Sequence, residues 1–94
     1  MPQIPPLPIR LPAHCGTAAA PALHRALLDV IAAGHPPVID AGEVETLGQA
    51  MLQLLLAARA AAPATTIDPA SPAFAERVHA LRLAGPLGLT QREA

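Results

Sequence analysis

The sequence VIDAGEVETLGQAMLQLLL, residues 38–56, decides the fold, because it joins an extended segment to an apolar helix through a short link. Residues 37–41 form a short apolar run between chain-breaking residues, which predicts a buried strand. From Gly48 to about residue 61 the chain is apolar nearly all round, which predicts a helix that is packed on several sides or pressed against a partner. At the junction the chain offers only Gly48 and Gln49, where an enzyme would present a nucleophile, a base or a phosphate-binding loop.

The other elements alternate in the same way along the chain. Residues 7–11 predict an edge strand because a proline lies within them, and residues 64–68 predict a third strand from their β-branched side chains. A helix is expected over about 18–33, with Thr17 as its cap and Gly34 as its stop.

The sequence SPAFAERVHALRLAG, residues 71–85, has the clearest helix signature. Ser71 is a good N-cap, Pro72 suits the first helical position, and Gly85 stands just past the expected end. The buried stripe of this helix is predicted to consist of Phe74, Val78 and Leu81.

Strands that alternate with helices of this length predict parallel strands joined by right-handed crossovers, and therefore an α/β fold. We expect one domain over 7–90, in which Leu87 and Leu89 pack near the end. An irregular lead-in is expected at 1–6 and a frayed tail at 91–94.

Composition excludes one class of partner. Of the 94 residues, 52% are hydrophobic and 14% charged, which supports a packed globule rather than a disordered chain. The six arginines are scattered singly, there is no lysine, and Phe74 is the only aromatic residue. Because a nucleic-acid binder needs a basic stripe, usually with stacking residues, we expect no nucleic acid as partner.

The single cysteine, Cys15, rules out an internal disulfide and agrees with a reducing compartment. The N-terminus lacks the charged and apolar regions of a signal peptide, and the longest apolar run is too short to cross a bilayer. We therefore expect a cytoplasmic protein without direct membrane insertion.

The chemically reactive residues do not form a recognisable catalytic set. His14 and Cys15 are adjacent, but neighbours in a strand point to opposite faces, so a buried thiol is a better interpretation than a catalytic pair. The four histidines lack paired metal-ligand spacing, and no second cysteine joins them. We expect no metal, no cofactor and no enzymatic activity.

Asp40 and Asp68 form the alternative chemical site. Both follow expected parallel strands, where open α/β sheets place their ligands, so paired acids could hold Mg²⁺ in a small metal- or nucleotide-binding domain. The lysine that such phosphoryl chemistry normally uses is absent. Capping of the turns that follow the strands is therefore the favoured interpretation.

Residues 38–56 resemble the STAS domain family, named after sulfate transporters and anti-sigma factor antagonists. That family has a strand ending in Asp, a short hydrophobic link, an Asp-Ser/Thr-Ser/Ala-Gly/Ala motif and a Leu-rich helix. The matching residues are Val38, Ile39 and Asp40 in the strand, Val44 and Leu47 in the link, and Ala50, Leu52, Leu54 and Leu55 in the helix.

The likeness extends over about 7–89 and looks closest to a small stand-alone branch. That branch includes the STAS subunit of the bacterial lipid-asymmetry transporter and proteins that accompany chemotaxis systems. The resemblance implies a layered α/β fold, with a small, mostly parallel sheet of about four strands packed by helices.

Two departures from the family pattern concern its phosphorylation switch. The family's aspartate falls on Gly48, which is a tolerable change of helix cap, and its phosphorylatable Ser or Thr falls on Gln49. Gln49 has no hydroxyl and does not imitate the charge of a phosphate, so the resemblance implies a member without the usual switch. Thr46 is a fallback acceptor.

The resemblance implies a non-enzymatic domain that recognises a protein partner at this turn. The expected partner is an anti-sigma kinase, a chemotaxis component or the ATPase of an ABC-type lipid transporter. A homodimer, formed through the apolar second helix or an open sheet edge, is a further possibility. The predicted partner-binding residues are Leu47, Gly48, Gln49, Ala50 and Gln53.

Overall fold

The computed structural model of this chain describes residues 8–87. The expected lead-in at 1–6, the packing of Leu89 and the frayed tail at 91–94 lie outside the described residues.

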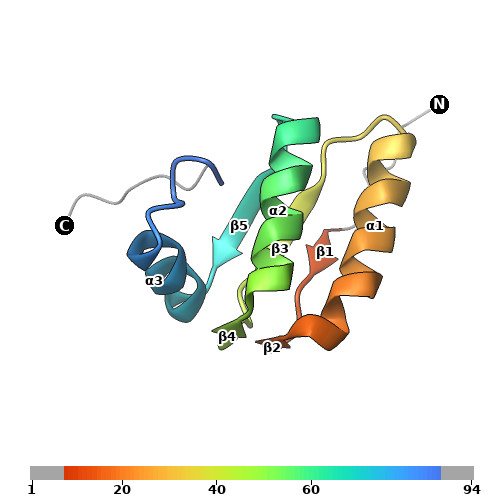
Figure 1. The fold of residues 1–94 in the computed structure, drawn as a ribbon. Helices are drawn as coiled ribbons and strands as arrows, with labels where there is room; N and C mark the ends of the chain where they lie inside the picture. Colours follow the sequence, from red (N-terminus) through yellow and green to blue (C-terminus); the bar gives the residue numbers. More distant parts are fainter. Residues whose placement is uncertain (1–7, 88–94) are drawn as a thin grey trace.

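A three-stranded parallel sheet forms one layer of the fold (Figure 1). Its strands are β1 (Ile9–Arg10), β3 (Val38–Ala41) and β5 (Thr66–Ala70), in the order β1-β3-β5. Both pairings are parallel, so the predicted α/β class and the three predicted strands are confirmed.

Two further strands, β2 (His14–Cys15) and β4 (Thr46–Leu47), pair in parallel as a second small sheet. β2 follows β1, and β4 follows β3, so the same two chain segments pair twice. Each strand has only two residues, which is too short to show a period-two pattern, so the sequence did not predict either as a strand. These two strands hold the segments that lead into α1 and α2.

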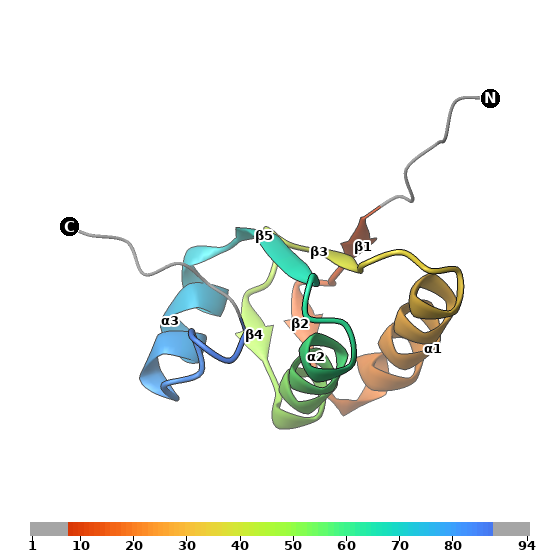
Figure 2. The same cartoon turned by 90° about the horizontal axis from the view of Figure 1, so that it is seen from above.

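Three α-helices, α1 (Ala20–Ala32), α2 (Gln49–Ala61) and α3 (Pro72–Ala80), complete the fold, with a short 3₁₀ helix η1 (Thr17–Ala19) before α1. Seen from above, α1 and α2 lie together on one side of the main sheet, and α3 lies beyond β4 (Figure 2). Helix α2 packs against α1 and η1, whereas Gln53, Ala57 and Ala60 remain exposed, so the predicted enclosure of this helix on several sides is only partial.

The strand β3 is buried on one face, so the prediction of a buried strand holds for alternate residues only. Ile39 and Ala41 face the helices and are fully buried, whereas Val38 is 37% exposed. Side chains alternate across a strand, and helices α1 and α2 cover only one face of this sheet.

Strand β1 is the first edge of the sheet, and prolines protect it from pairing. The N–H of Leu11 donates to the carbonyl of Asp40 at 2.9 Å, so positions 8, 10 and 12 direct their backbone groups away from β3. Pro8 and Pro12 have no N–H, which leaves Arg10 as the single donor of these three. One form of the homodimer hypothesis requires a second chain to pair with an open sheet edge. The β1 edge is poorly suited to such pairing.

The helix ends show why one boundary was predicted correctly and another was not. Helix α1 ends in a Schellman motif in which Gly34, at φ 85°, donates to the carbonyl of Ile31 at 3.0 Å. Helix α3 ends in the same motif, but its left-handed residue is Arg82, at φ 60°, which donates to the carbonyl of His79. The predicted stop at Gly85 was therefore wrong.

Two residues that the sequence assigned to helices have other roles. Leu81 follows the end of α3 and is 42% exposed, so its place in the buried stripe was wrong, although Phe74 and Val78 are fully buried as predicted. Thr17 makes no cap hydrogen bond, because it lies within η1 instead of before α1.

Candidate functional site

The start of α2 is built on the neighbouring strand β2. Gly48 is the N-cap of α2 and has no side chain to cap it, and its N–H donates to the carbonyl of Cys15 at 2.8 Å. A Cβ on Gly48 would lie only 3.0 Å from the same carbonyl oxygen and 3.6 Å from the Cα of Gly16. Glycine therefore lets β2 and the helix start approach closely, a reason for this residue that the sequence did not reveal.

Of the five predicted partner-binding residues, three lie at the surface and two hold the helix start in place. Gln49 and Gln53 are exposed, and Ala50 is half-buried beside them. Leu47 is only 6% exposed, so its side chain belongs to the core. Together with Gly48, it holds the helix start in place, while the two glutamines present their amides to solvent.

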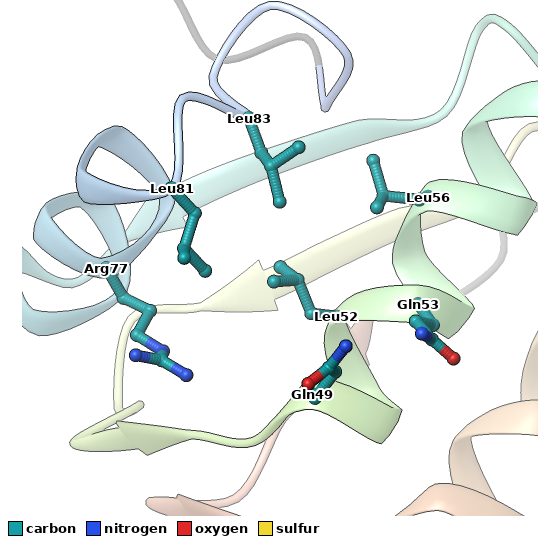
Figure 3. Close-up of a pocket in the computed structure, with 7 residues that line it drawn as sticks. All are labelled: Gln49, Leu52, Gln53, Leu56, Arg77, Leu81 and Leu83. Atoms are coloured by element: carbon teal, nitrogen blue, oxygen red, sulfur yellow. The ribbon is translucent and has the colours of Figure 1, made fainter.

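One groove lies between α2 and the end of α3 and has a volume of about 270 Å³. We call it the α2–α3 groove. In Figure 3 the leucine side chains converge in its centre, while Arg77 reaches from α3 toward the end where Gln49 lies. Its lining residues are Gln49, Leu52, Gln53, Leu56, Arg77, Leu81 and Leu83.

A second, more open groove lies on the other side of α2, against η1 and α1. We call it the α1–α2 groove. Ala50 and Gln53 line it from α2, and His24 lines it from α1. Because Gln53 lines both grooves, the first turns of α2 form a ridge between two hollows.

Arg77 connects α3 to the start of α2. Its Nε donates a hydrogen bond of 3.1 Å to the carbonyl of Leu47. This bond satisfies a backbone acceptor at the end of β4, one residue before the N-cap. Arg77 was missed at the sequence level, because a contact between residues far apart in the chain leaves no local pattern.

Thr46 is the fallback phosphoacceptor, and it lies on β4 beside the site. It is exposed, and its Oγ1 lies 3.3 Å from the Nδ1 of His14 on β2. The hydroxyl is therefore on the surface, but it belongs to a strand and not to the helix start.

Cys15 and His14 do not form a catalytic pair. Cys15 is fully buried, and its Sγ donates to the carbonyl of Pro12 at 3.1 Å, whereas His14 is exposed. Burial raises the pKa of the Cys15 thiol, which opposes formation of the nucleophilic thiolate. The buried thiol was predicted correctly, and the exposed His14 and buried Cys15 of β2 point to opposite faces.

Asp40 is engaged within the protein. Its Oδ1 accepts the N–H of Gly42 at 2.9 Å, and its Oδ2 lies 3.7 Å from the Nε of Arg10. The first contact is the turn cap that the sequence favoured. Asp68 lies on the neighbouring strand β5 and is exposed.

Residues 8–87 contain neither a metal-binding cluster nor a membrane-spanning helix. No group of three His, Cys, Asp or Glu residues there could hold a metal ion. Over the same residues, no helix has the length and apolar character needed to cross a membrane.

Comparison with protein families gives one result. A family model described as "Mlab, STAS domain" matches residues 7–91 of the chain. Neither the curated proteins nor the solved structures contain a significant match.

Proposed function

Because this chain belongs to the STAS domain family, whose members are regulatory or protein-interaction domains and generally not enzymes, we propose that it docks a protein partner through the start of α2. The docking surface consists of Gln49, Ala50 and Gln53, supported from below by Leu47 and Gly48. Its partner is an anti-sigma kinase, a chemotaxis component or the ATPase of a lipid transporter.

The observation that carries this proposal is the ridge at the start of α2. Gln49 and Gln53 are exposed between two grooves, and neither amide has a charge to desolvate when a partner covers it. Removing a neutral amide from water is far less costly than removing an ion, provided that the partner supplies hydrogen bonds. A neutral ridge between hollows that are lined mostly by apolar residues therefore suits a protein interface.

We also propose that the partner binds without any phosphorylation at this turn. Position 49 carries an amide, which cannot accept a phosphoryl group, and the neighbouring residues Gly48 and Ala50 have no hydroxyl either. Any regulation of binding acts through another residue or through the concentration of the partner.

Affinity capture from a native cell extract tests the docking surface. Wild-type protein, Gln49→Arg and Ala60→Arg serve as baits, and mass spectrometry identifies the retained proteins. Ala60 is exposed on the same face of α2 but about 16 Å further along the axis, so it controls for the added charge.

We expect a partner that wild type and Ala60→Arg retain and that Gln49→Arg loses, with unchanged circular dichroism in all three proteins. The identity of that partner distinguishes the three partner classes. A partner retained equally by all three baits would place the interface elsewhere.

A further inference from the structure

Among the described residues, the charge that lines the α2–α3 groove is positive only. Among the described residues that line the groove, Arg77 is the only ionisable one, and the others are leucines and glutamines. Within residues 8–87 the one ion pair found joins Arg10 to Asp40, so no described carboxylate neutralises Arg77. The groove therefore combines an apolar centre with a positive charge at one end.

The geometry of Arg77 leaves part of its guanidinium for a ligand. Nε donates to the carbonyl of Leu47, which fixes the side chain against the start of α2. A guanidinium has five N–H donors, and the four on its two Nη atoms match the two oxygens of a carboxylate. Because Nε is held by the fold, less side-chain entropy is lost when a carboxylate binds.

The size of the groove suits a side chain of a partner. Its volume is about 270 Å³, close to the lower limit of roughly 300 Å³ for small-molecule sites. Four leucines, Leu52, Leu56, Leu81 and Leu83, supply its apolar lining. A hollow of this kind suits one large apolar side chain of a partner, the usual form of an interface anchor.

We propose that the α2–α3 groove selects a partner segment in which a large apolar side chain lies next to an Asp or Glu. The apolar side chain enters among the leucines, and the carboxylate pairs with Arg77. This inference rests on the proposed docking function and adds a recognition rule to it, with Arg77 as the residue that determines specificity.

A peptide selection tests the rule without knowledge of the natural partner. Random peptides displayed on phage are selected on the immobilised full chain, and one enriched peptide is then titrated against purified variants. We expect enriched peptides to carry Asp or Glu close to a large apolar residue.

The variants separate the local charge from other effects. Arg77→Gln should weaken the peptide about fivefold, the upper end for an exposed ion pair. Arg77→Lys keeps the charge but loses the guanidinium fork and the Nε bond that fixes it, so its affinity should lie between those of Arg77→Gln and wild type. Arg25→Gln is the matched control, since Arg25 is exposed on α1 and does not line the groove, and it should leave the affinity unchanged.

Several results would overturn the rule. They are enrichment without an acidic preference, equal effects of Arg77→Gln and Arg25→Gln, or no enrichment over an unrelated control protein. Peptides that lack acidic residues but are lost with Gln49→Arg would overturn the charge rule alone and leave docking at α2 intact. Peptides that tolerate both Gln49→Arg and Arg77→Gln would contradict the rule and the docking surface together.

Discussion

The Nε of Arg77 on α3 donates a hydrogen bond of 3.1 Å to the carbonyl of Leu47, one residue before the N-cap of α2. The bond joins two residues that lie 30 positions apart in the chain, at the edge of the candidate docking surface. Arg77 therefore has a structural contact and, in our proposal, a recognition contact on the same guanidinium.

Loss of the Arg77–Leu47 bond should lower stability independently of charge. Arg77→Gln and Arg77→Lys both remove the Nε donor, and each should reduce the free energy of unfolding by about 1 kcal/mol. Urea denaturation followed by circular dichroism measures the change. A lysine variant as stable as wild type would show that the bond contributes nothing, while the peptide affinities above report the charge separately.

Substitution at Gly48 should disturb the helix start more than the same substitution at Gly16. An alanine Cβ at 48 would meet the carbonyl of Cys15 at 3.0 Å, and alanine is also a poorer N-cap than glycine. We expect Gly48→Ala to cost about 1 kcal/mol. Gly16→Ala finds no atom within 4 Å of its new Cβ and should change stability by less than about 0.5 kcal/mol. Equal urea midpoints for the two variants would refute the close approach.

Arg82 and Gly34 occupy the same position in the two Schellman motifs. Substitutions at these two positions should change the free energy of unfolding in opposite directions. Arg82 adopts φ 60°, which is costly for a residue with a Cβ, so Arg82→Gly should raise the free energy of unfolding by up to about 1 kcal/mol. Gly34 adopts φ 85°, so Gly34→Ala should lower it by about 1 kcal/mol. Thermal unfolding of both variants measures these changes, and destabilisation by Arg82→Gly would contradict the left-handed geometry.

The Cys15 thiol should make the fold sensitive to alkaline pH. Burial raises the pKa of the thiol above its ordinary value of 9.0, so above that pH the unfolded chain loses its proton before the folded chain does. The free energy of unfolding is therefore unaffected by this group near neutral pH and falls as the pH rises beyond 9.0.

The chain is well suited to this measurement, because it contains no lysine and no tyrosine. Cys15 is then the only side chain with an ordinary pKa in the alkaline range below arginine. Urea midpoints measured from neutral to alkaline pH should fall for wild type and remain nearly flat for Cys15→Ala. The same downward slope in both proteins would remove Cys15 as its cause.

The sequence predicted those parts of the fold that depend on local patterns. The strands β1, β3 and β5, the extent of α2, the stop of α1 at Gly34 and the cap of α3 at Ser71 all follow from periodicity and turn chemistry. The end of α3 was missed because Arg82, which has no intrinsic preference for positive φ, takes the place of a glycine.

The sequence predicted where in the chain the candidate site lies, but not its three-dimensional shape. Gln49 and its neighbours were placed by resemblance, but the two grooves depend on how α1 and α3 lie beside α2. The roles of Gly48 and Arg77 depend on contacts with Cys15 and Leu47, which are tertiary and leave no sequence signal.

Site-specific photo-crosslinking in living cells tests the central claim, docking at the start of α2, most directly. The photoreactive residue p-benzoylphenylalanine replaces Gln49 in one variant and Ala60 in another, which lies on the same helix face. We predict that illumination links position 49 to one distinct protein and leaves position 60 without that product. Identical products from the two positions, or a product from position 60 alone, would contradict the account.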